Sequence, residues 1–501
     1  MGYRVWLYVL VLGCSMDASA QIRLPKFFSD HAVLQRDRPI HVWGWDFPDK
    51  TVRVRLGTAT GTAPVDDLGH WSLWLMPMTA GGPYVLDVDD GQSRVTLEDI
   101  YLGDVWVASG QSNMQMPLKG FPAYPVQDSA KEIAAANHPD LRLLMVDGAA
   151  SSFPKADISS DGWKPSSPES AAPFSAVAYF FGRELAEREH VKIGLIESVW
   201  GGTPIESWMS YEGLASTNES GRAFAMRAMV AGKVTDRDDE TARYKRRAAD
   251  AVAKGQKPPT APWYPDEESL QLASLYNGMI APLTPYAIKG VIWYQGEAND
   301  SDERAPAYAA LFSGMIQDWR THWSEGDFPF LFVQLPGVAN APAGWAVVRD
   351  AQRRTLAVAN TGMATTLDVG EARTAHPPDK QDVGHRLALV ARARVYGEAV
   401  EYSGPLFRQM TQEGHGLRLW FDHADGLSAK AGELKDFEVA GPDGIFAEAK
   451  ATLNQGSILV MSDKVARPVT VRYGGASWSA GNIVNSSGLP APSFIASLPH
   501  R

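Results

Sequence analysis

The chain has 501 residues, 45% of them hydrophobic and 21% charged, which suits two or three globular domains with a large core. Its formal charge of −11, from 58 acidic and 47 basic residues, argues against nucleic acid or an anionic membrane surface as a partner. Core packing explains most of the 16 tryptophans, although flat indole rings also suit a sugar-binding surface.

The first 20 residues predict a secretory signal peptide. Arg4 supplies a positive charge, residues 5–13 are apolar but too few to span a bilayer, and the Ala-Ser-Ala run at 18–20 matches a cleavage site. The only cysteine, Cys14, lies inside this segment, so cleavage after Ala20 leaves a mature chain without a thiol. We expect a secreted or periplasmic protein without a membrane span, and lipid anchoring through Cys14 is the less favoured alternative.

Both ends of the mature chain have β character. In residues 21–100, Val52–Leu56 alternates strictly between apolar and polar side chains, and Tyr84–Val88 does so nearly. Residues 401–501 contain further strand-like runs at 417–421, 457–461 and 469–473. The sequence leaves open whether the two β regions form one module.

Residues 101–400 alternate predicted strands with amphipathic helices, and the clearest helix follows Ser175 as N-cap. After the apolar run that begins at Val105, further strands are predicted at 193–199, 288–294, 330–335 and 363–369, with helices near 308–319, 346–358 and 378–393. This pattern predicts an α/β domain with a five-stranded parallel sheet. The charged segment 218–268 interrupts the order and predicts a partly helical insertion over the sheet, either a solvated excursion or a lid over a cleft.

The first predicted strand of this domain ends in Gly110-Gln111-Ser112-Asn113, and Pro117 limits the next segment to about one helical turn. This arrangement places a hydroxyl on a sharp turn at the end of a strand, where nucleophiles are displayed in α/β sheets. Ser112 is therefore the candidate nucleophile.

A serine nucleophile needs a base, and His376 is the best candidate because it follows the last predicted strand and should lie at the same sheet edge. Two prolines after it suit a helix start. Asp368 or Glu371 is expected to orient its ring. Asp379 and Asp382 are less suited, because they begin the following helix.

Two other predicted strands also end in groups that suit an oxyanion hole. Gly201 and Gly202 follow the strand at 193–199, and their small size lets backbone N–H groups approach a ligand. Gln295 and Asn299 follow the next strand and bring side-chain amides to the same edge.

These motifs resemble the sialate O-acetylesterase-like carbohydrate esterases of the SGNH hydrolase superfamily. The resemblance is carried by Gly110–Met114, Trp200–Thr203, Trp293–Asn299 and the His376-Pro377 pair followed by Lys380 and Val383-Gly384. Residues 30–37 and 485–491 also look like that family, so the resemblance covers almost the whole mature chain.

The resemblance implies a flavodoxin-like SGNH domain with accessory β-sandwich-like regions, and hydrolysis of sugar acetyl esters without a metal or cofactor. It also implies Ser112 as nucleophile, His376 as base, and an oxyanion hole from the Ser112 N–H, a Gly201 or Gly202 N–H and the amide of Gln295 or Asn299. Residues expected to contact the substrate are Gln111, Asn113, Trp200, Glu297 and Arg373. For Glu297, ordering its own loop is the alternative.

One departure concerns the third member of the triad. Many SGNH enzymes have an aspartate three residues before the histidine, and several relatives have one two residues before it. Here Arg373 and Thr374 occupy those positions. Glu371 is slightly favoured over Asp368 as the acid, and a Ser–His dyad is the alternative.

We therefore predict a secreted carbohydrate O-acetylesterase that forms a serine acyl-enzyme. Its substrate is either O-acetylated sialic acid, for which Arg373 would supply a cation, or acetylated hemicellulose such as xylan or xyloglucan. The alternatives are a glycoside hydrolase that pairs Glu297 with Glu371 and a non-catalytic sugar-binding protein. The oligomeric state is not readable from the sequence.

Overall fold

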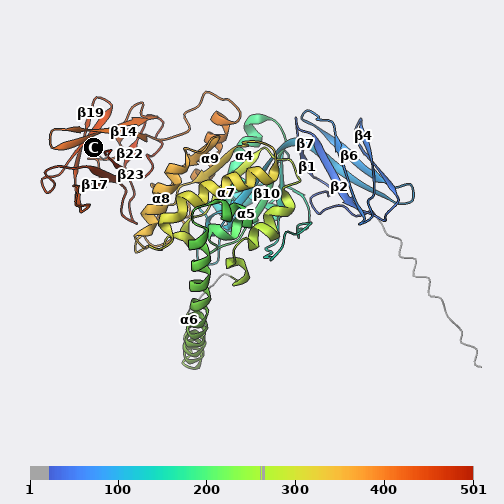
Figure 1. The fold of residues 1–501 in the computed structure, drawn as a ribbon, viewed down its shortest axis with the longest axis horizontal. Coiled ribbons are helices and arrows are strands. Elements are labelled where there is room, and N and C mark those ends of the chain that lie inside the picture. The colour runs from blue at the N-terminus through green and yellow to red at the C-terminus, as the bar shows by residue number, and fades with distance from the viewer. Residues whose placement is uncertain (1–21, 260, 262–265, 500–501) are drawn as a thin grey trace, which may run out of the picture.

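The computed structural model describes residues 22–259, 261 and 266–499. The signal segment predicted at 1–20, with Cys14, lies outside the described residues, so cleavage and anchoring stay predictions. A central α/β domain separates two β regions, which lie at opposite ends of the molecule (Figure 1). The two β regions therefore do not form one module.

A parallel sheet forms the centre of the α/β domain, with the strand order β13-β12-β11-β7-β10-β8. Its strands are β7 (Arg94–Gly110), β8 (Leu141–Met145), β10 (Ile193–Val199), β11 (Gly290–Tyr294), β12 (Phe330–Val333) and β13 (Thr361–Ala364). The five predicted strands are present in the order β10-β7-β11-β12-β13, which is the 2-1-3-4-5 order of flavodoxin-like folds.

The predicted number of five parallel strands is wrong, because β8 adds a sixth beside β10. The two-residue strand β9 (Lys164–Pro165) then pairs antiparallel with β8. The segment Leu-Arg-Leu-Leu-Met has only five residues, which is too short for its pattern to separate a strand from a helix, and its first four residues are all buried.

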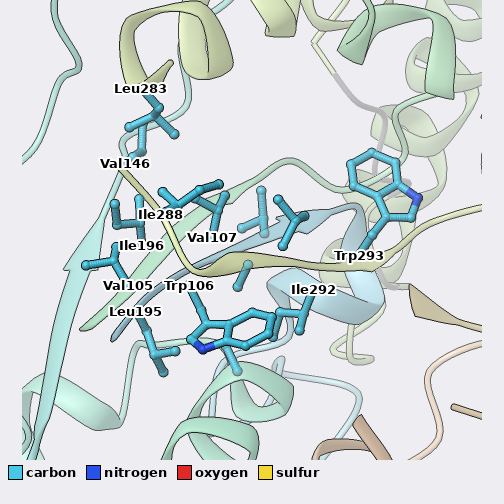
Figure 2. Packing of buried hydrophobic residues seen from close by; sticks show 14 of the residues in the cluster. Val105, Trp106, Val107, Val146, Leu195, Ile196, Leu283, Ile288, Ile292 and Trp293 are labelled. Atoms are coloured by element: carbon cyan, nitrogen blue, oxygen red, sulfur yellow. The ribbon is translucent and has the colours of Figure 1, made fainter. Parts of the chain in front are cut away.

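Helices cover both faces of this sheet. Trp106 and Trp293 point to opposite faces, as their register across β7 and β11 requires and as Figure 2 shows. Trp106 packs against Phe181, whereas Trp293 packs against Phe312 and Trp319. One face is covered by α4 (Ala176–Glu189), which packs on α9 (Gln381–Arg394), and the other by α7 (Tyr308–Trp323), which packs on α5 (Tyr211–Ser216) and α8 (Gly344–Thr355).

The helix predicted after Ser175 is confirmed as α4. The Ser175 hydroxyl accepts a hydrogen bond from the Ala178 N–H at 3.2 Å, as expected of an N-cap. The predicted helices near 308–319, 346–358 and 378–393 correspond to α7, α8 and α9, with ends displaced by a few residues.

The long strand β7 joins the N-terminal β region to the α/β domain. Its first part pairs with β1 and β6, and its last part pairs with β10 and β11. The strands of this region are β1 (Val33–Gln35), β2 (Ile40–Trp45), β3 (Thr51–Leu56), β4 (Ala59–Pro64), β5 (His70–Leu75) and β6 (Gly81–Asp89). Because the pairing is continuous, the two regions share one hydrophobic core.

The C-terminal β region has a core of its own, to which Leu367 of the α/β domain contributes. Two four-stranded antiparallel sheets, β14-β15-β20-β19 and β18-β17-β21-β23, enclose it. The strands are β14 (Leu406–Glu413), β15 (Gly416–Asp422), β16 (Ser428–Ala429), β17 (Phe437–Ala440), β18 (Phe446–Glu448), β19 (Lys450–Asn454), β20 (Ser457–Met461), β21 (Thr470–Tyr473), β22 (Ile483–Val484) and β23 (Phe494–Ser497).

The insertion contains one long helix, α6 (Ser220–Ala253), which contacts α5 and extends away from the α/β domain (Figure 1). The prediction that the insertion lies over the sheet is wrong for this helix. Across the described ranges, we find no helix with the length and apolar character needed to cross a bilayer.

Candidate active site

Ser112 begins the one-turn helix α1 (Ser112–Gln115) directly after β7. Gly110 makes this turn possible, because it has a φ of +136° and a Cβ there would lie 2.1 Å from the Tyr294 carbonyl oxygen. Backbone hydrogen bonds tie Gln111 to Tyr294 at 3.0 Å and Trp200 to Gly110 at 3.1 Å, so three strand ends are joined. Because the strand order reverses at β7, Ser112 lies where open α/β sheets bind ligands.

His376 lies on the loop between β13 and α9, and its Nε2 is 2.8 Å from the Ser112 Oγ. The His376 backbone N–H donates to the Thr374 hydroxyl at 2.9 Å. The rings of Tyr124 and Phe121 stand beside the imidazole, with centroids 5.0 and 5.9 Å away. The structure therefore brings the candidate nucleophile and base into direct contact.

Burial, reinforced by the positive charge of Lys380, lowers the pKa of His376 to about 4. The imidazole is therefore neutral at pH 7. A neutral ring with Nε2 unprotonated accepts the Ser112 hydroxyl proton, which is the arrangement a general base requires.

The structure brings neither predicted acid to this imidazole. Both Asp368 carboxylate oxygens bind the Arg386 guanidinium, at 2.6 and 2.9 Å. The Glu371 side chain is exposed, and only its backbone approaches the histidine loop, by pairing with Thr374. Within the described ranges, no carboxylate is hydrogen bonded to His376. Ser112 and His376 therefore form a pair without a third, acidic residue.

Gly201 lies against the serine, because a Cβ at Gly201 would be 3.3 Å from the Ser112 Cβ and 2.9 Å from the Gln115 Oε1. Its own N–H donates to that Gln115 oxygen at 2.8 Å. By contrast, the N–H groups of Ser112 and Gly202 donate to no acceptor in the described part of the chain. The backbone N–H of Gly202 is therefore free to donate to an oxyanion, whereas that of Gly201 is already used.

The two candidate amides belong to a buried network. The Gln295 Nε2 donates to the Thr203 carbonyl at 3.2 Å and to the Asn299 Oδ1 at 2.8 Å, which uses both of its hydrogens. The Asn299 Nδ2 donates to the Glu206 Oε2 at 2.9 Å. Since this is the one bond from that nitrogen to a described residue, Asn299 retains a hydrogen that Gln295 lacks.

Asn113, predicted to contact the substrate, instead makes three buried intramolecular hydrogen bonds. Its Nδ2 donates to the Glu297 Oε1 at 2.6 Å and to the Ala375 carbonyl at 2.8 Å, and its Oδ1 accepts from the Lys380 Nζ at 2.5 Å. Asn113 is buried and these bonds use both of its amide hydrogens, which leaves it no free donor for a substrate. The bond to Asn113 favours the alternative prediction for Glu297, in which this side chain orders its own loop.

Three other residues were predicted to contact a substrate. Gln111 is buried, and its Oε1 accepts from the Ala298 N–H at 3.1 Å. Trp200 is half-buried at the end of β10. Arg373 is exposed and forms no ion pair with any described residue.

Sequence reasoning did not single out Lys380, Phe121 or Tyr124 as parts of the site. Lys380 had a usable signal, since it follows His376 by four residues within one of the motifs that carried the resemblance. The two aromatic residues follow the Ser112 turn by about ten residues, and only the folded loop brings them to His376.

Comparisons with known proteins find sialate O-acetylesterases and a further carbohydrate acetylesterase. A family model described as a carbohydrate esterase, sialic acid-specific acetylesterase, matches residues 251–391, a stretch that includes His376. Sialate O-acetylesterase from Mus musculus is 28% identical over 551 residues, covering 98% of this chain and 97% of its own, and that from Homo sapiens is 28% identical, covering 97% and 95%.

A solved structure also supports this family assignment. A carbohydrate acetylesterase from Xanthomonas citri is 35% identical, covers 95% of this chain and 99% of its own, and superposes with a TM-score of 0.82. The family resemblance found in the sequence is confirmed.

Proposed function

The chain belongs to the carbohydrate esterase family of sialic acid-specific acetylesterases, and we propose that it removes acetyl groups from sugars with Ser112 as nucleophile and His376 as base. The observation that carries the proposal is the 2.8 Å contact between the His376 Nε2 and the Ser112 Oγ at the switch point of the sheet. The family supplies the reaction class, and this contact supplies the chemistry for it.

The reaction follows from this contact. The Ser112 Oγ attacks the acetyl carbonyl carbon while its proton passes to the His376 Nε2. The N–H groups of Ser112 and Gly202, with the remaining Asn299 amide hydrogen, stabilise the oxyanion. His376 returns the proton to the departing sugar oxygen, and water then releases acetate from the acyl-enzyme by the same steps in reverse order.

We propose that this catalysis uses a dyad. Asp368 is committed to Arg386, and Glu371 is exposed without a bond to the ring. The imidazole is instead oriented by its surroundings, which include Thr374 and the rings of Phe121 and Tyr124. The absence of a stabilising carboxylate costs rate relative to a full triad but leaves the general-base step intact.

The test of the serine mechanism is Ser112→Ala, with Ser109→Ala as its control. Ser109 lies three residues before Ser112, in the strand β7, and its buried hydroxyl has no partner among the described residues. We expect Ser112→Ala to lower acetate release about 10⁴-fold or more, and Ser109→Ala to leave it unchanged. Unchanged turnover in Ser112→Ala would exclude the mechanism.

Two substrate classes fit the proposal. The curated relatives are sialate O-acetylesterases, and the exposed Arg373, three residues before His376, would supply a cation for a sialate carboxylate. Acetylated xylan and xyloglucan have no such carboxylate on their acetylated residues, so Arg373 would not contribute to their binding.

Acetate release from a panel of acetylated sialosides, xylans and xyloglucans separates the two classes. If the substrate is a sialoside, Arg373→Ala should raise its KM about tenfold and leave the KM for a neutral ester unchanged. Release of reducing ends from unacetylated glycan would instead favour a glycoside hydrolase. We also propose export by residues 1–20, which predicts a mature protein that begins at Gln21.

A further inference from the structure

One hydrogen bond joins the two segments that carry Ser112 and His376. Asn113 directly follows Ser112, and Ala375 directly precedes His376. The Asn113 Nδ2 donates to the Ala375 carbonyl at 2.8 Å, across 262 residues of sequence. A movement of either segment of the order of 1 Å would break this bond, so the bond reports and restrains the distance between nucleophile and base.

The orientation of the Asn113 amide is fixed by charges on its two sides. Its oxygen faces the Lys380 ammonium, with Oδ1 and Nζ 2.5 Å apart, and its nitrogen faces the Glu297 carboxylate, with Nδ2 and Oε1 2.6 Å apart. A flipped amide would turn its N–H groups towards the ammonium and its oxygen towards the carboxylate. Both contacts would then be repulsive, so Lys380 and Glu297 keep the N–H aimed at Ala375.

The three side chains come from three elements that meet only in the folded chain. Asn113 lies in α1, Glu297 begins the 3-10 turn after β11 (Glu297–Asn299), and Lys380 immediately precedes α9. Lys380 is fully buried, and its Nζ lies 5.7 Å from the centre of the Tyr294 ring. The cluster therefore connects the Ser112 turn, the neighbouring strand end and the loop of His376.

Burial opposes the charge of both outer members of the cluster. It lowers the pKa of Lys380 to about 7 and raises the pKa of Glu297 to about 7. The second Glu297 oxygen is buried without a partner among the described residues. Apolar residues of similar volume would often be as stable or more so, which favours a role in function over a role in stability.

We propose that Asn113, Glu297 and Lys380 are positioning residues that hold the His376 loop against the Ser112 turn, in place of the carboxylate that orients the base in a triad. The inference builds on the proposed function, since it assigns these residues an effect on the Ser112–His376 pair. None of the three touches the reacting atoms in this arrangement. Asn113 acts through the backbone on either side of that pair, and Lys380 also acts on His376 by its charge.

The sharpest variant is Asn113→Asp, which keeps the shape of the side chain and the acceptor for Lys380 but removes both N–H donors. We expect kcat for acetate release to fall about 100-fold, because the loop of His376 is freed by about 1 Å, with KM changed less than about twofold. The matched control is Asn485→Asp. Asn485 is also a buried amide that donates to two backbone carbonyls, those of Ser403 and His423, but it lies in the C-terminal β region.

A double variant separates positioning from stability. In Asn113→Asp with Glu297→Gln, the glutamine amide can donate to the new carboxylate, which restores that contact with its polarity reversed. The carboxylate still cannot donate to the Ala375 carbonyl. We expect the melting temperature to recover towards that of the wild type while kcat stays low, whereas recovery of both together would show a merely structural role and overturn the proposal.

Labelling of Ser112 by a small organophosphonate gives a second readout that does not depend on the sugar. We expect Asn113→Asp to slow labelling about as much as it lowers kcat, and Asn485→Asp to leave it unchanged. Wild-type labelling without acetate release from any panel member would count against the proposed substrate class, while the labelling rates still test the positioning. Equal labelling rates for the wild type and Asn113→Asp would overturn the positioning role. A wild-type protein that is neither labelled nor active would overturn both the positioning role and the proposed esterase function.

Discussion

The Ser112 turn and the His376 loop meet at one sheet edge but are held in place by different means. Ser112 follows the central strand β7, and backbone hydrogen bonds from Gln111 and Trp200 tie that strand end to its neighbours. His376 follows the edge strand β13 on a half-exposed loop whose contacts come from side chains, including those of Thr374 and Asn113. Sheet topology positions the nucleophile, whereas tertiary side-chain contacts position the base.

The largest effect expected on the loop side is that of His376→Ala. Loss of the base should lower kcat about 10³- to 10⁴-fold, with residual turnover from the oxyanion donors alone. Acetate-release kinetics measure it, and His415→Ala, which removes an exposed histidine of the C-terminal region, should have no effect. A loss below about tenfold would mean that another group takes the proton.

On the serine side, substitutions should act through sterics, and Gly201→Ala is the clearest case. The added methyl would meet the Ser112 Cβ at 3.3 Å and the Gln115 Oε1 at 2.9 Å, which displaces the nucleophile. We expect kcat to fall about 10- to 100-fold, as a misplacement near 1 Å does. Gly221→Ala in α6 is the control, because its added methyl would meet no described residue outside its own helix within 4 Å. Equal activity in both variants would contradict the close contact at Ser112.

The pH profile sharpens the comparison on the loop side. The base works only when unprotonated, so the lowered pKa of His376, about 4, places the acid limb of wild-type kcat/KM near pH 4. Thr374→Asp would put a carboxylate where a hydroxyl now contacts the histidine backbone. A nearby negative charge raises the pKa of His376, so the acid limb should move up by about one pH unit and neutral-pH kcat should rise up to about tenfold.

Thr374→Asn provides the control for that variant, since it matches the shape of aspartate without its charge. Rates of acetate release between about pH 3 and 8 would be compared for the three proteins. If the acid limb of the pH profile does not move in Thr374→Asp, or moves equally in Thr374→Asn, the introduced carboxylate does not act on His376.

The smallest effect should come from Glu371→Gln, because that side chain is exposed and bonded to no described residue near the ring. We expect kcat to change less than about twofold, whereas loss of a true triad acid costs orders of magnitude. Asp368→Asn should lower the melting temperature, since it weakens the nearly buried pair with Arg386, but should leave kcat per folded molecule similar. A large fall in kcat with Glu371→Gln would restore it as the acid.

Local sequence patterns predicted much of the fold. The strand predicted at 193–199 is β10 with the same ends, and all its residues, Glu197 and Ser198 included, are buried because helices cover both faces of the sheet. Ser175 was predictable as an N-cap because a hydroxyl preceded a helical apolar spacing. The strand β8 and the projection of α6 away from the sheet were not predicted, although a partly helical insertion was, because a five-residue run and a charged insertion carry no period that indicates their place in space.

The sequence by itself determined that a serine and a histidine follow strands of one sheet, because a glycine turn after β7 and a proline-led helix start after His376 are local signals. Only the tertiary structure decided what surrounds them. The Asp368 carboxylate pairs with Arg386, and the Gln295 amide donates both hydrogens within a buried network. The Asn113 amide donates to the Ala375 carbonyl. Each of these choices depends on a hydrogen-bond partner supplied by another segment of the chain, and the spacing of residues along one segment does not encode which partner arrives.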